Sequence, residues 1–191
     1  MIKKILLSLA SLFLIWQSYN LFYNIHKLDI SSWGTLFFIA WLINLFITGV
    51  FAFSGFAFPT QKLLPPSYYR ILHPKKLQQT FKVLKVNLFR KILLATLWKR
   101  KKQRKEFFDG TKSGIANLLE QSMKSEFGHL LPFVIICFVS GYLIAIGLIK
   151  LALLSLLINL IGNLYPIVLQ RHHRMRVQLI RTRQEAIINS G

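Results

Sequence analysis

The sequence predicts an all-α integral membrane protein with about four transmembrane helices, an amphipathic interfacial helix and a C-terminal helical hairpin. Two observations lead to this class. The 191 residues are 53% hydrophobic and yet carry a formal net charge of +19, which is typical of membrane helices with basic cytoplasmic segments and not of a soluble domain. In addition, four apolar stretches are each about as long as a bilayer is thick. The single Cys137 excludes a disulfide within the chain.

The first two apolar stretches are Ile5–Ile25 and Trp33–Phe58. Lys3 and Lys4 precede the first stretch as they would in a signal peptide. However, the stretch is too long and no small-residue cleavage site follows it, so we expect a retained helix. The second stretch is long enough to cross a bilayer with some tilt.

The other two apolar stretches, Leu130–Ile149 and Leu151–Leu169, are separated only by Lys150. One helix of their combined length would be about 60 Å long, roughly twice the hydrocarbon thickness. We therefore expect a hairpin that turns near Gly147–Lys150. The chain is then predicted to have three segments, an N-terminal two-helix membrane segment (1–58), a basic loop with amphipathic helices (59–129) and a transmembrane hairpin with a basic tail (130–191).

The positive charges predict the orientation of these spans. Two lysines precede the first span, sixteen Lys or Arg lie in 59–129, and five arginines follow the fourth span, while only Lys27 and Lys150 fall on the other side. Lys and Arg accumulate on the cytoplasmic side of membrane proteins. We therefore expect a multi-pass protein of the bacterial inner membrane with both termini in the cytoplasm.

The basic loop contains one predicted amphipathic helix from Lys76 to Ala95. Its apolar side chains recur at three- and four-residue steps: Leu77, Phe81, Leu84, Leu88, Ile92 and Ala95. The flanking lysines and arginines favour a helix that lies among the headgroups of anionic lipids. A helix packed on the bundle is the alternative.

Two further features follow in the loop. The basic run Lys99–Lys105 indicates either a solvated cluster attracted to phospholipid or a binding surface for an anionic cofactor or carrier protein. Nucleic-acid binding is not expected, because no known nucleic-acid-binding module is recognisable in the sequence. Asp109-Gly110 predicts a turn, after which Ser113–Glu126 predicts a helix that leads into the third span.

Polar residues converge at the predicted cytoplasmic end of the hairpin. Five residues of 163–176 share one face at regular helical spacing: Asn163, Pro166, Gln170, Arg171 and Arg174. Such groups must meet protein, water or a ligand where the helix leaves the bilayer. If the hairpin packs antiparallel, Glu126 and His129 lie at the same depth.

Glu126 and His129 stand three residues apart and so share a helix face. A carboxylate beside an imidazole fixes the tautomer of the ring and suits a general base, although an interfacial salt bridge is the alternative. Pro132 and Pro166 each remove a helical N–H nearby. Loosened backbone at membrane depth is tolerated where it lines a cavity or meets other protein groups.

The order Glu-x-x-His, a hydrophobic hairpin and then Asn-x-x-Pro-Ile-x-x-Gln-Arg-x-x-Arg resembles the small membrane acyltransferases of the glycosyl-4,4'-diaponeurosporenoate acyltransferase family. These enzymes finish staphylococcal carotenoid biosynthesis by esterifying a hydroxyl of the carotenoid's glucose. The resemblance covers about residues 70–180. The chain departs from the family pattern at Leu130, where a tryptophan is usual, and at His172-His173, where Tyr-Asn is usual.

The resemblance implies a membrane acyltransferase that esterifies a hydroxyl of a glycosylated or other lipid-phase acceptor with a fatty acyl group. It implies catalytic roles for Glu126, His129, Gln170 and Arg171. His129 would act as the base, oriented by Glu126, and Gln170 and Arg171 would donate to the oxyanion. A non-catalytic membrane assembly or anchoring protein is the alternative.

The resemblance also implies the ligands. Asn163, Arg174 and Arg176 would bind substrate, and the arginines with the run Lys99–Lys105 would hold the phosphates of acyl-CoA or of an acyl-carrier protein. These donors are co-substrates, and no bound cofactor is expected. No metal site is expected either, because the side chains of His172 and His173 diverge by about 100° on a helix and no cysteine pairs with them. The expected partners are anionic membrane lipids, the lipid-phase acceptor and the acyl donor.

Overall fold

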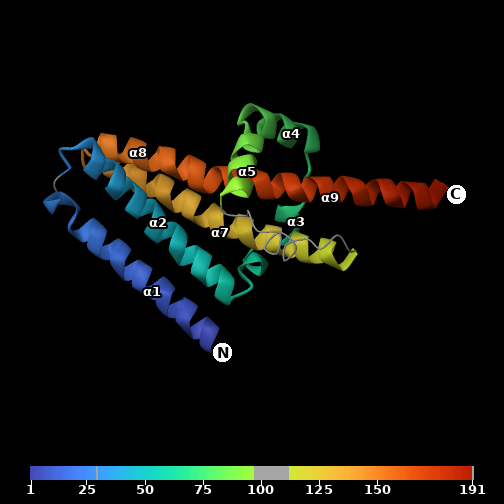
Figure 1. Ribbon diagram of the computed structural model, residues 1–191, viewed down its shortest axis with the longest axis horizontal. Helices are drawn as coiled ribbons and strands as arrows, with labels where there is room; N and C mark the ends of the chain where they lie inside the picture. The colour runs from blue at the N-terminus through green and yellow to red at the C-terminus, as the bar shows by residue number, and fades with distance from the viewer. Residues whose placement is uncertain (29, 97–111, 191) are drawn as a thin grey trace. The chain divides into compact units, whose positions relative to one another are not determined.

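The computed structural model describes residues 1–28, 30–96 and 112–190. Within these ranges every regular element is a helix (Figure 1). Four helices are long and apolar enough to cross a membrane: Ile2–Tyr23, Trp33–Ala57, Gly114–Ala145 and Ile149–Ile180. The predicted fold class is therefore confirmed. The basic run Lys99–Lys105 and the turn predicted at Asp109-Gly110 lie outside the described residues.

The chain divides into two compact units. Unit 1 comprises Met1–Thr60 and Phe127–Pro166, and unit 2 comprises Gln61–Glu126 and Ile167–Gly191. The long helix α7 (Lys112–Ala145) contributes its first part to unit 2 and its second part to unit 1. The helix predicted from Ser113 to Glu126 is confirmed, since it is the beginning of α7 and leads into the third span without a break.

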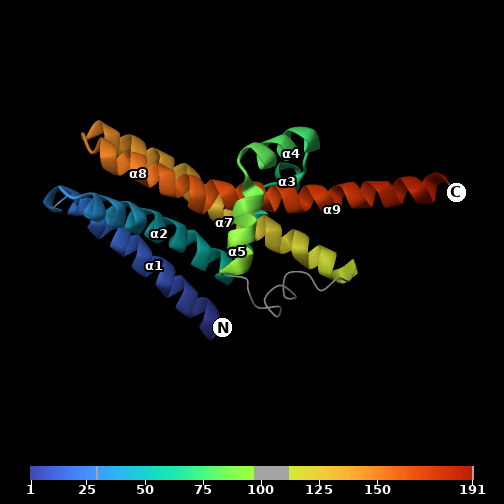
Figure 2. The same cartoon turned by 45° about the horizontal axis from the view of Figure 1, so that its top comes forward.

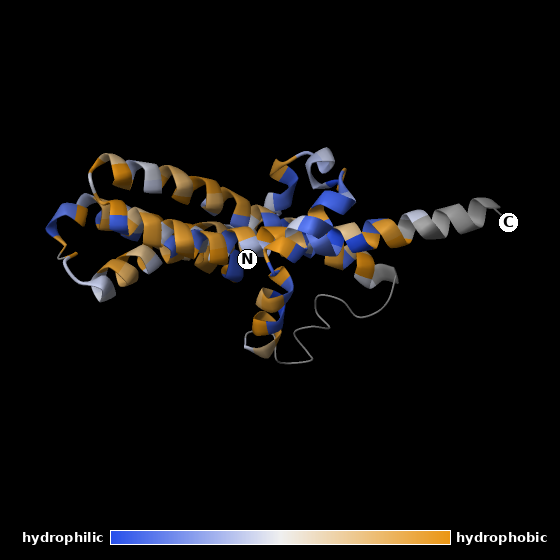
Figure 3. Cartoon of the chain, turned by 90° about the horizontal axis from the view of Figure 1, so that it is seen from above, coloured by the Kyte–Doolittle hydropathy of each residue, from blue (hydrophilic) through white to orange (hydrophobic). Residues whose placement is uncertain are grey.

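Unit 1 is a bundle of apolar helices. Besides part of α7 it contains α1 (Ile2–Tyr23), α2 (Trp33–Ala57), α8 (Ile149–Asn159) and the π-helical turn η3 (Leu160–Leu164). Helix α2 packs against both α1 and α8. Figure 3 shows these helices as mostly hydrophobic, with a few hydrophilic positions between. The buried core joins three helices through Ile39 and Ile43 of α2, Ile136 and Leu143 of α7, and Leu151 of α8.

Helices α1 and α2 approach each other closely. A Cβ atom at Gly49 would overlap with Cδ1 of Leu14, so a larger residue at Gly49 would require the Leu14 side chain to move. The Ser11 hydroxyl donates a hydrogen bond to the carbonyl of Val50 at 3.1 Å. Small residues and interhelical hydrogen bonds are the usual means of helix association in a membrane.

The predicted hairpin is confirmed. Helix α7 ends at Ala145, α8 begins at Ile149, and Gly147 between them has a φ of +83°. The N–H of Leu148 donates to the carbonyl of Leu143 at 2.8 Å, and the N–H of Gly147 donates to Ile144 at 3.0 Å. This is a Schellman C-cap, in which glycine readily adopts the left-handed conformation.

A π-helical turn precedes α9 (Tyr165–Ser190). The N–H of Tyr165 donates to the carbonyl of Leu160, five residues earlier. Pro166 lies two residues after this turn and has no N–H to donate to the carbonyl of Gly162, so the α-helical hydrogen bond between these residues is absent. The turn also changes the 3.6-residue spacing on which the predicted shared face of 163–174 depends.

Unit 2 contains the short helices. They are η2 (Thr60–Leu63, which begins at the last residue of unit 1), α3 (Pro66–Tyr69), α4 (Pro74–Val83) and α5 (Val86–Ala95). The single amphipathic helix predicted from Lys76 to Ala95 is wrong, because Lys85 adopts a left-handed conformation (φ 50°, ψ 35°) that separates α4 from α5. The break lets both Phe81 and Val86 become buried, with 8% and 0% of their surfaces exposed.

Candidate functional site

A chain of buried side-chain amides holds His129 in unit 1. The ring Nδ1 of His129, on α7, lies 3.0 Å from Oδ1 of Asn163. Asn163 donates from Nδ2 to Oδ1 of Asn159 at 2.9 Å, and Asn159 donates from Nδ2 to the backbone carbonyl of Phe133 at 3.0 Å. Both asparagines are almost fully buried. The π-helical turn contains Asn163 and so presents this amide.

The direction of donation along this chain follows from its last member. A backbone carbonyl only accepts, so Asn159 must turn its Nδ2 toward Phe133 and its Oδ1 toward Asn163. Asn163 must then turn its own Oδ1 toward His129. An amide oxygen also only accepts, so the neutral ring carries its proton on Nδ1 and its lone pair on Nε2. This is the tautomer in which Nε2 can act as a base.

Other groups of unit 1 complete the surroundings of the ring. The Thr48 hydroxyl lies 3.1 Å from Nδ2 of Asn163, so α2 also contacts this amide. The ring of His129 also interacts with the backbone of Gly162. The carbonyl of Gly162 has no α-helical donor four residues later, because Pro166 has no N–H. The backbone that was predicted to be loosened by Pro166 therefore contacts the His129 ring.

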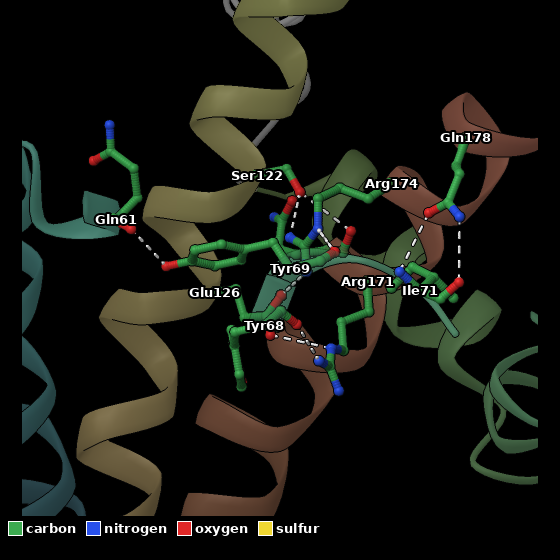
Figure 4. A network of polar contacts seen from close by, with 10 residues as sticks. Gln61, Tyr68, Tyr69, Ile71, Ser122, Glu126, Arg171, Arg174 and Gln178 are labelled. Carbon is green, nitrogen blue, oxygen red and sulfur yellow. Dashed lines mark hydrogen bonds and ion pairs between the residues drawn. The ribbon is translucent and has the colours of Figure 1, made fainter. Parts of the chain in front are cut away.

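Unit 2 contains a second polar cluster, centred on Glu126 (Figure 4). The Glu126 side chain is completely buried at the end of the first part of α7. Its Oε1 lies 3.1 Å from Nε of Arg171, and its Oε2 is paired with Nη2 of Arg174. Two guanidinium groups thus face one carboxylate, and the cluster retains one excess positive charge.

The two arginines differ in their exposure. Arg174 is buried, and its other nitrogens donate to the Ser122 hydroxyl at 2.8 Å and to the carbonyl of Tyr69 at 3.4 Å. Arg171 keeps 33% of its side chain exposed and donates from Nη2 to the carbonyl of Tyr68 at 3.2 Å. Arg174 therefore has a structural role within the cluster, while Arg171 remains accessible to a ligand.

Helix α3 supplies the rings that cover the cluster. The guanidinium of Arg171 lies 5.1 Å from the ring centre of Tyr68, and that of Arg174 lies 5.3 Å from the ring centre of Tyr69. Burial, with the nearby Glu126 carboxylate as the next cause, raises the pKa of Tyr68 to about 12. Burial likewise raises the pKa of Tyr69. Both phenols are therefore neutral donors at physiological pH.

Hydrogen bonds fasten the segment around α3. The Tyr69 hydroxyl donates to the carbonyl of Gln61 at 3.1 Å. The side chain of Gln178, on α9, accepts from the N–H of Ile71 at 3.2 Å and donates to its carbonyl at 3.3 Å (Figure 4). The N–H and the carbonyl of Ile71 thus both hold this segment to α9.

The remaining predicted site residues have distinct environments. Gln170 is buried, and its backbone carbonyl accepts from the Ser122 hydroxyl at 3.2 Å, whereas Arg176 is exposed. The structure brings Glu126 together with Arg171 and Arg174, and His129 together with Asn163. The groups that the sequence did not reveal are Thr48, Tyr68, Tyr69, Ser122 and Asn159. One sequence signal could have identified Asn159 as a site residue: it is polar within an apolar run and lies four residues before Asn163.

No group of three or more His, Cys, Asp and Glu gathers among the residues that the structure describes. In the Glu126 cluster the cationic group that keeps part of its side chain exposed is Arg171.

The fold and these clusters define the class of the protein, an all-α protein with helices able to span a membrane and a partly buried, amide-held histidine. A sequence model of CrtO, glycosyl-4,4'-diaponeurosporenoate acyltransferase, matches residues 65–183. The chain belongs to this family, whose name is that of an acyltransferase of carotenoid biosynthesis. The match includes both clusters except for Thr48. Searches of curated proteins and of solved structures gave no match.

Proposed function

We propose that this chain is a membrane acyltransferase that transfers a fatty acyl group from acyl-CoA or an acyl-carrier protein to a hydroxyl of a glycosylated carotenoid or a similar lipid-phase acceptor. The observation that carries the proposal is the His129–Asn163 contact, because it leaves Nε2 of a membrane-embedded ring as the proton acceptor. Membership in the family supports the same reaction.

In the proposed reaction, Nε2 of His129 takes the proton of the acceptor hydroxyl while the oxygen attacks the thioester carbonyl. The tetrahedral intermediate collapses, the C–S bond breaks and the thiolate leaves. The imidazolium returns its proton to the thiolate, so the products are an ester and a free thiol. The family resemblance implies Arg171 as a donor to the oxyanion, and its partly exposed side chain and the surplus positive charge of its cluster are compatible with that role.

The residues differ in their proposed roles. Asn163 positions His129, and Asn159 positions Asn163, so Asn163 takes the orienting role that the sequence suggested for Glu126. Glu126 and Arg174 hold Arg171 in place. Arg176 is exposed and remains a candidate contact for the acyl donor. Gln170 remains a candidate second hydrogen-bond donor to the oxyanion.

We also propose that the protein lies in the bacterial inner membrane with both termini in the cytoplasm, because 23 of the 25 Lys and Arg then fall on the cytoplasmic side. A periplasmic reporter enzyme should be active when fused after Leu28 and inactive when fused after Gly191. Activity at Gly191 would contradict the proposed orientation.

The function can be tested in cells with and without the gene, by extraction of lipids and pigments and mass spectrometry. Loss of an acylated glycolipid with accumulation of its unacylated form is the expected result, and expression of the wild-type gene should restore it. An unchanged profile would contradict the enzyme and favour the non-catalytic anchoring protein.

A further inference from the structure

Unit 2 contains a cavity of about 590 Å³ whose lining includes no residue of the Glu126 cluster. Helices α4 and α5 form most of it, and α9 contributes His172. Figures 1 and 2 show α4 and α5 beside α9. Four cationic side chains line it, Lys82, Lys85, Arg90 and Lys91. Among the described residues that line the cavity there is no carboxylate, so an anionic ligand is the natural counterpart of this charge.

Two observations on α5 point to a ligand. Nε of Arg90 is buried and has no hydrogen-bond partner among the described residues, although a buried guanidinium donor normally has one. In addition, the N-cap of α5 is Lys85, which provides no side-chain cap. The first N–H groups of a helix have no acceptor within the helix and carry partial positive charge, which favours anions such as phosphate.

A pair of stacked rings adjoins the cations. The rings of Phe81 and His172 are 3.9 Å apart between centres and inclined by 16°, and both residues line the cavity. Phe81 is buried, so the partly exposed ring of His172, held in place by this stack, offers the flat surface for a planar base. The cavity therefore combines positive charge for phosphates with rings for an aromatic group.

We propose that this cavity binds the phosphorylated nucleotide head of coenzyme A, which would make a coenzyme A thioester the acyl donor; the inference rests on the proposed function. The nucleotide head has a diphosphate and a phosphate monoester, together about four negative charges, which match the four cations. The phosphate of a phospholipid or of a carrier protein's phosphopantetheine is a diester with about one charge, and neither brings a purine.

The test measures binding of coenzyme A by calorimetry, with the full-length protein in nanodiscs of phosphatidylcholine. Arg90→Gln with Lys91→Gln removes two charges from the cavity. Lys75→Gln with Lys76→Gln removes two charges from α4 at exposed positions that do not line it. The cavity variant should raise the Kd by about tenfold or more, or ~1.4 kcal/mol, and the control variant by less than about twofold.

Two further probes identify the group that is bound. Coenzyme A without its 3'-phosphate should bind several-fold more weakly, and pantetheine should not compete. Lys85→Gly removes a cavity charge at a backbone conformation that suits glycine, so it should weaken binding while the protein stays folded. This variant keeps the test valid if the double variant fails to fold.

Several results would overturn the proposal. They are an absence of coenzyme A binding by the wild type, equal weakening in the cavity and control variants, and equal binding of pantetheine. Binding of phosphatidylglycerol that is lost in the cavity variant, together with no binding of coenzyme A, would assign the cavity to a lipid headgroup.

His129→Ala should leave the Kd for coenzyme A unchanged, because binding does not require the base. Coenzyme A binding in the cavity with an unaltered pigment profile would contradict the proposed function alone. A lost acylated glycolipid without coenzyme A binding would contradict this inference alone.

Discussion

Nδ1 of His129 meets Oδ1 of Asn163 at 3.0 Å, and neither group needs to be charged for the contact to form. A histidine base is often oriented by a carboxylate, but a carboxylate is costly within a membrane-spanning helix. Here neutral amides fix the tautomer, and a backbone carbonyl determines their direction. The one buried carboxylate nearby in the sequence, Glu126, is instead paired with arginines in unit 2.

Asn163→Leu removes the acceptor that holds the His129 ring while it keeps an apolar side chain of similar volume. We expect kcat to fall about 10- to 100-fold, a part of the 10²–10⁴ that a positioned base contributes, with a smaller change in KM. Thr48→Val is the matched control, since Thr48 contacts Asn163 without an observed contact to the ring. Equal losses in both variants, measured by single-turnover assays, would mean that the amide acts through packing.

Glu126→Gln should destabilise the protein by about 3 kcal/mol or more, because it leaves the buried Arg174 without its counter-charge. Glu126→Gln combined with Arg174→Met should recover much of that loss, since replacing both members of a buried ion pair is often neutral. Unfolding of the detergent-solubilised protein measures both effects. A fully stable single variant would show that the cluster has no structural role.

The sequence predicted the spans, the hairpin and its turn because apolar length and glycine are local signals. It also selected Asn163, Arg171 and His129 as site residues, since polar groups at a membrane boundary require partners. It did not reveal which partners they have. The ion pairs of Glu126 join segments nearly fifty residues apart, and no local pattern encodes such contacts.

The break between α4 and α5 shows the same limitation in another form. Neither Leu84 nor Lys85 is a residue that usually ends a helix, and the apolar period continues across them. The break allows Phe81 to stack on His172 and Val86 to become buried. Tertiary packing therefore overrides the local preference of the sequence.

Tyr68→Phe should reduce the loss of stability at alkaline pH. The phenol titrates near 10.0 when unfolded and at about 12 in the folded protein. A raised pKa in the folded state gives stability that is fully present below pH 10 and is lost as the pH rises through 12. Chemical unfolding across this window should show a flatter profile for Tyr68→Phe than for Tyr23→Phe, an exposed control. Identical profiles would contradict the burial of Tyr68.

Lys85→Gly should increase the free energy of unfolding by a few tenths to about 1 kcal/mol. A side chain in the left-handed region costs about 1–2 kcal/mol, part of which the greater flexibility of glycine in the unfolded chain cancels. Lys82→Gly, at a right-handed helical position in the last turn of α4, should instead destabilise by up to about 1 kcal/mol. If Lys85→Gly destabilises as much as Lys82→Gly, the left-handed conformation is wrong.

The most direct test of the central claim is the rate of acyl transfer by purified His129→Ala in nanodiscs, with a glycosylated carotenoid and an acyl thioester. The account predicts a loss of about 10²–10⁴-fold with the unfolding transition preserved, while His73→Ala, an exposed histidine within the family match, keeps the wild-type rate. A His129→Ala protein that retains most of its activity would contradict the assignment of His129 as the base.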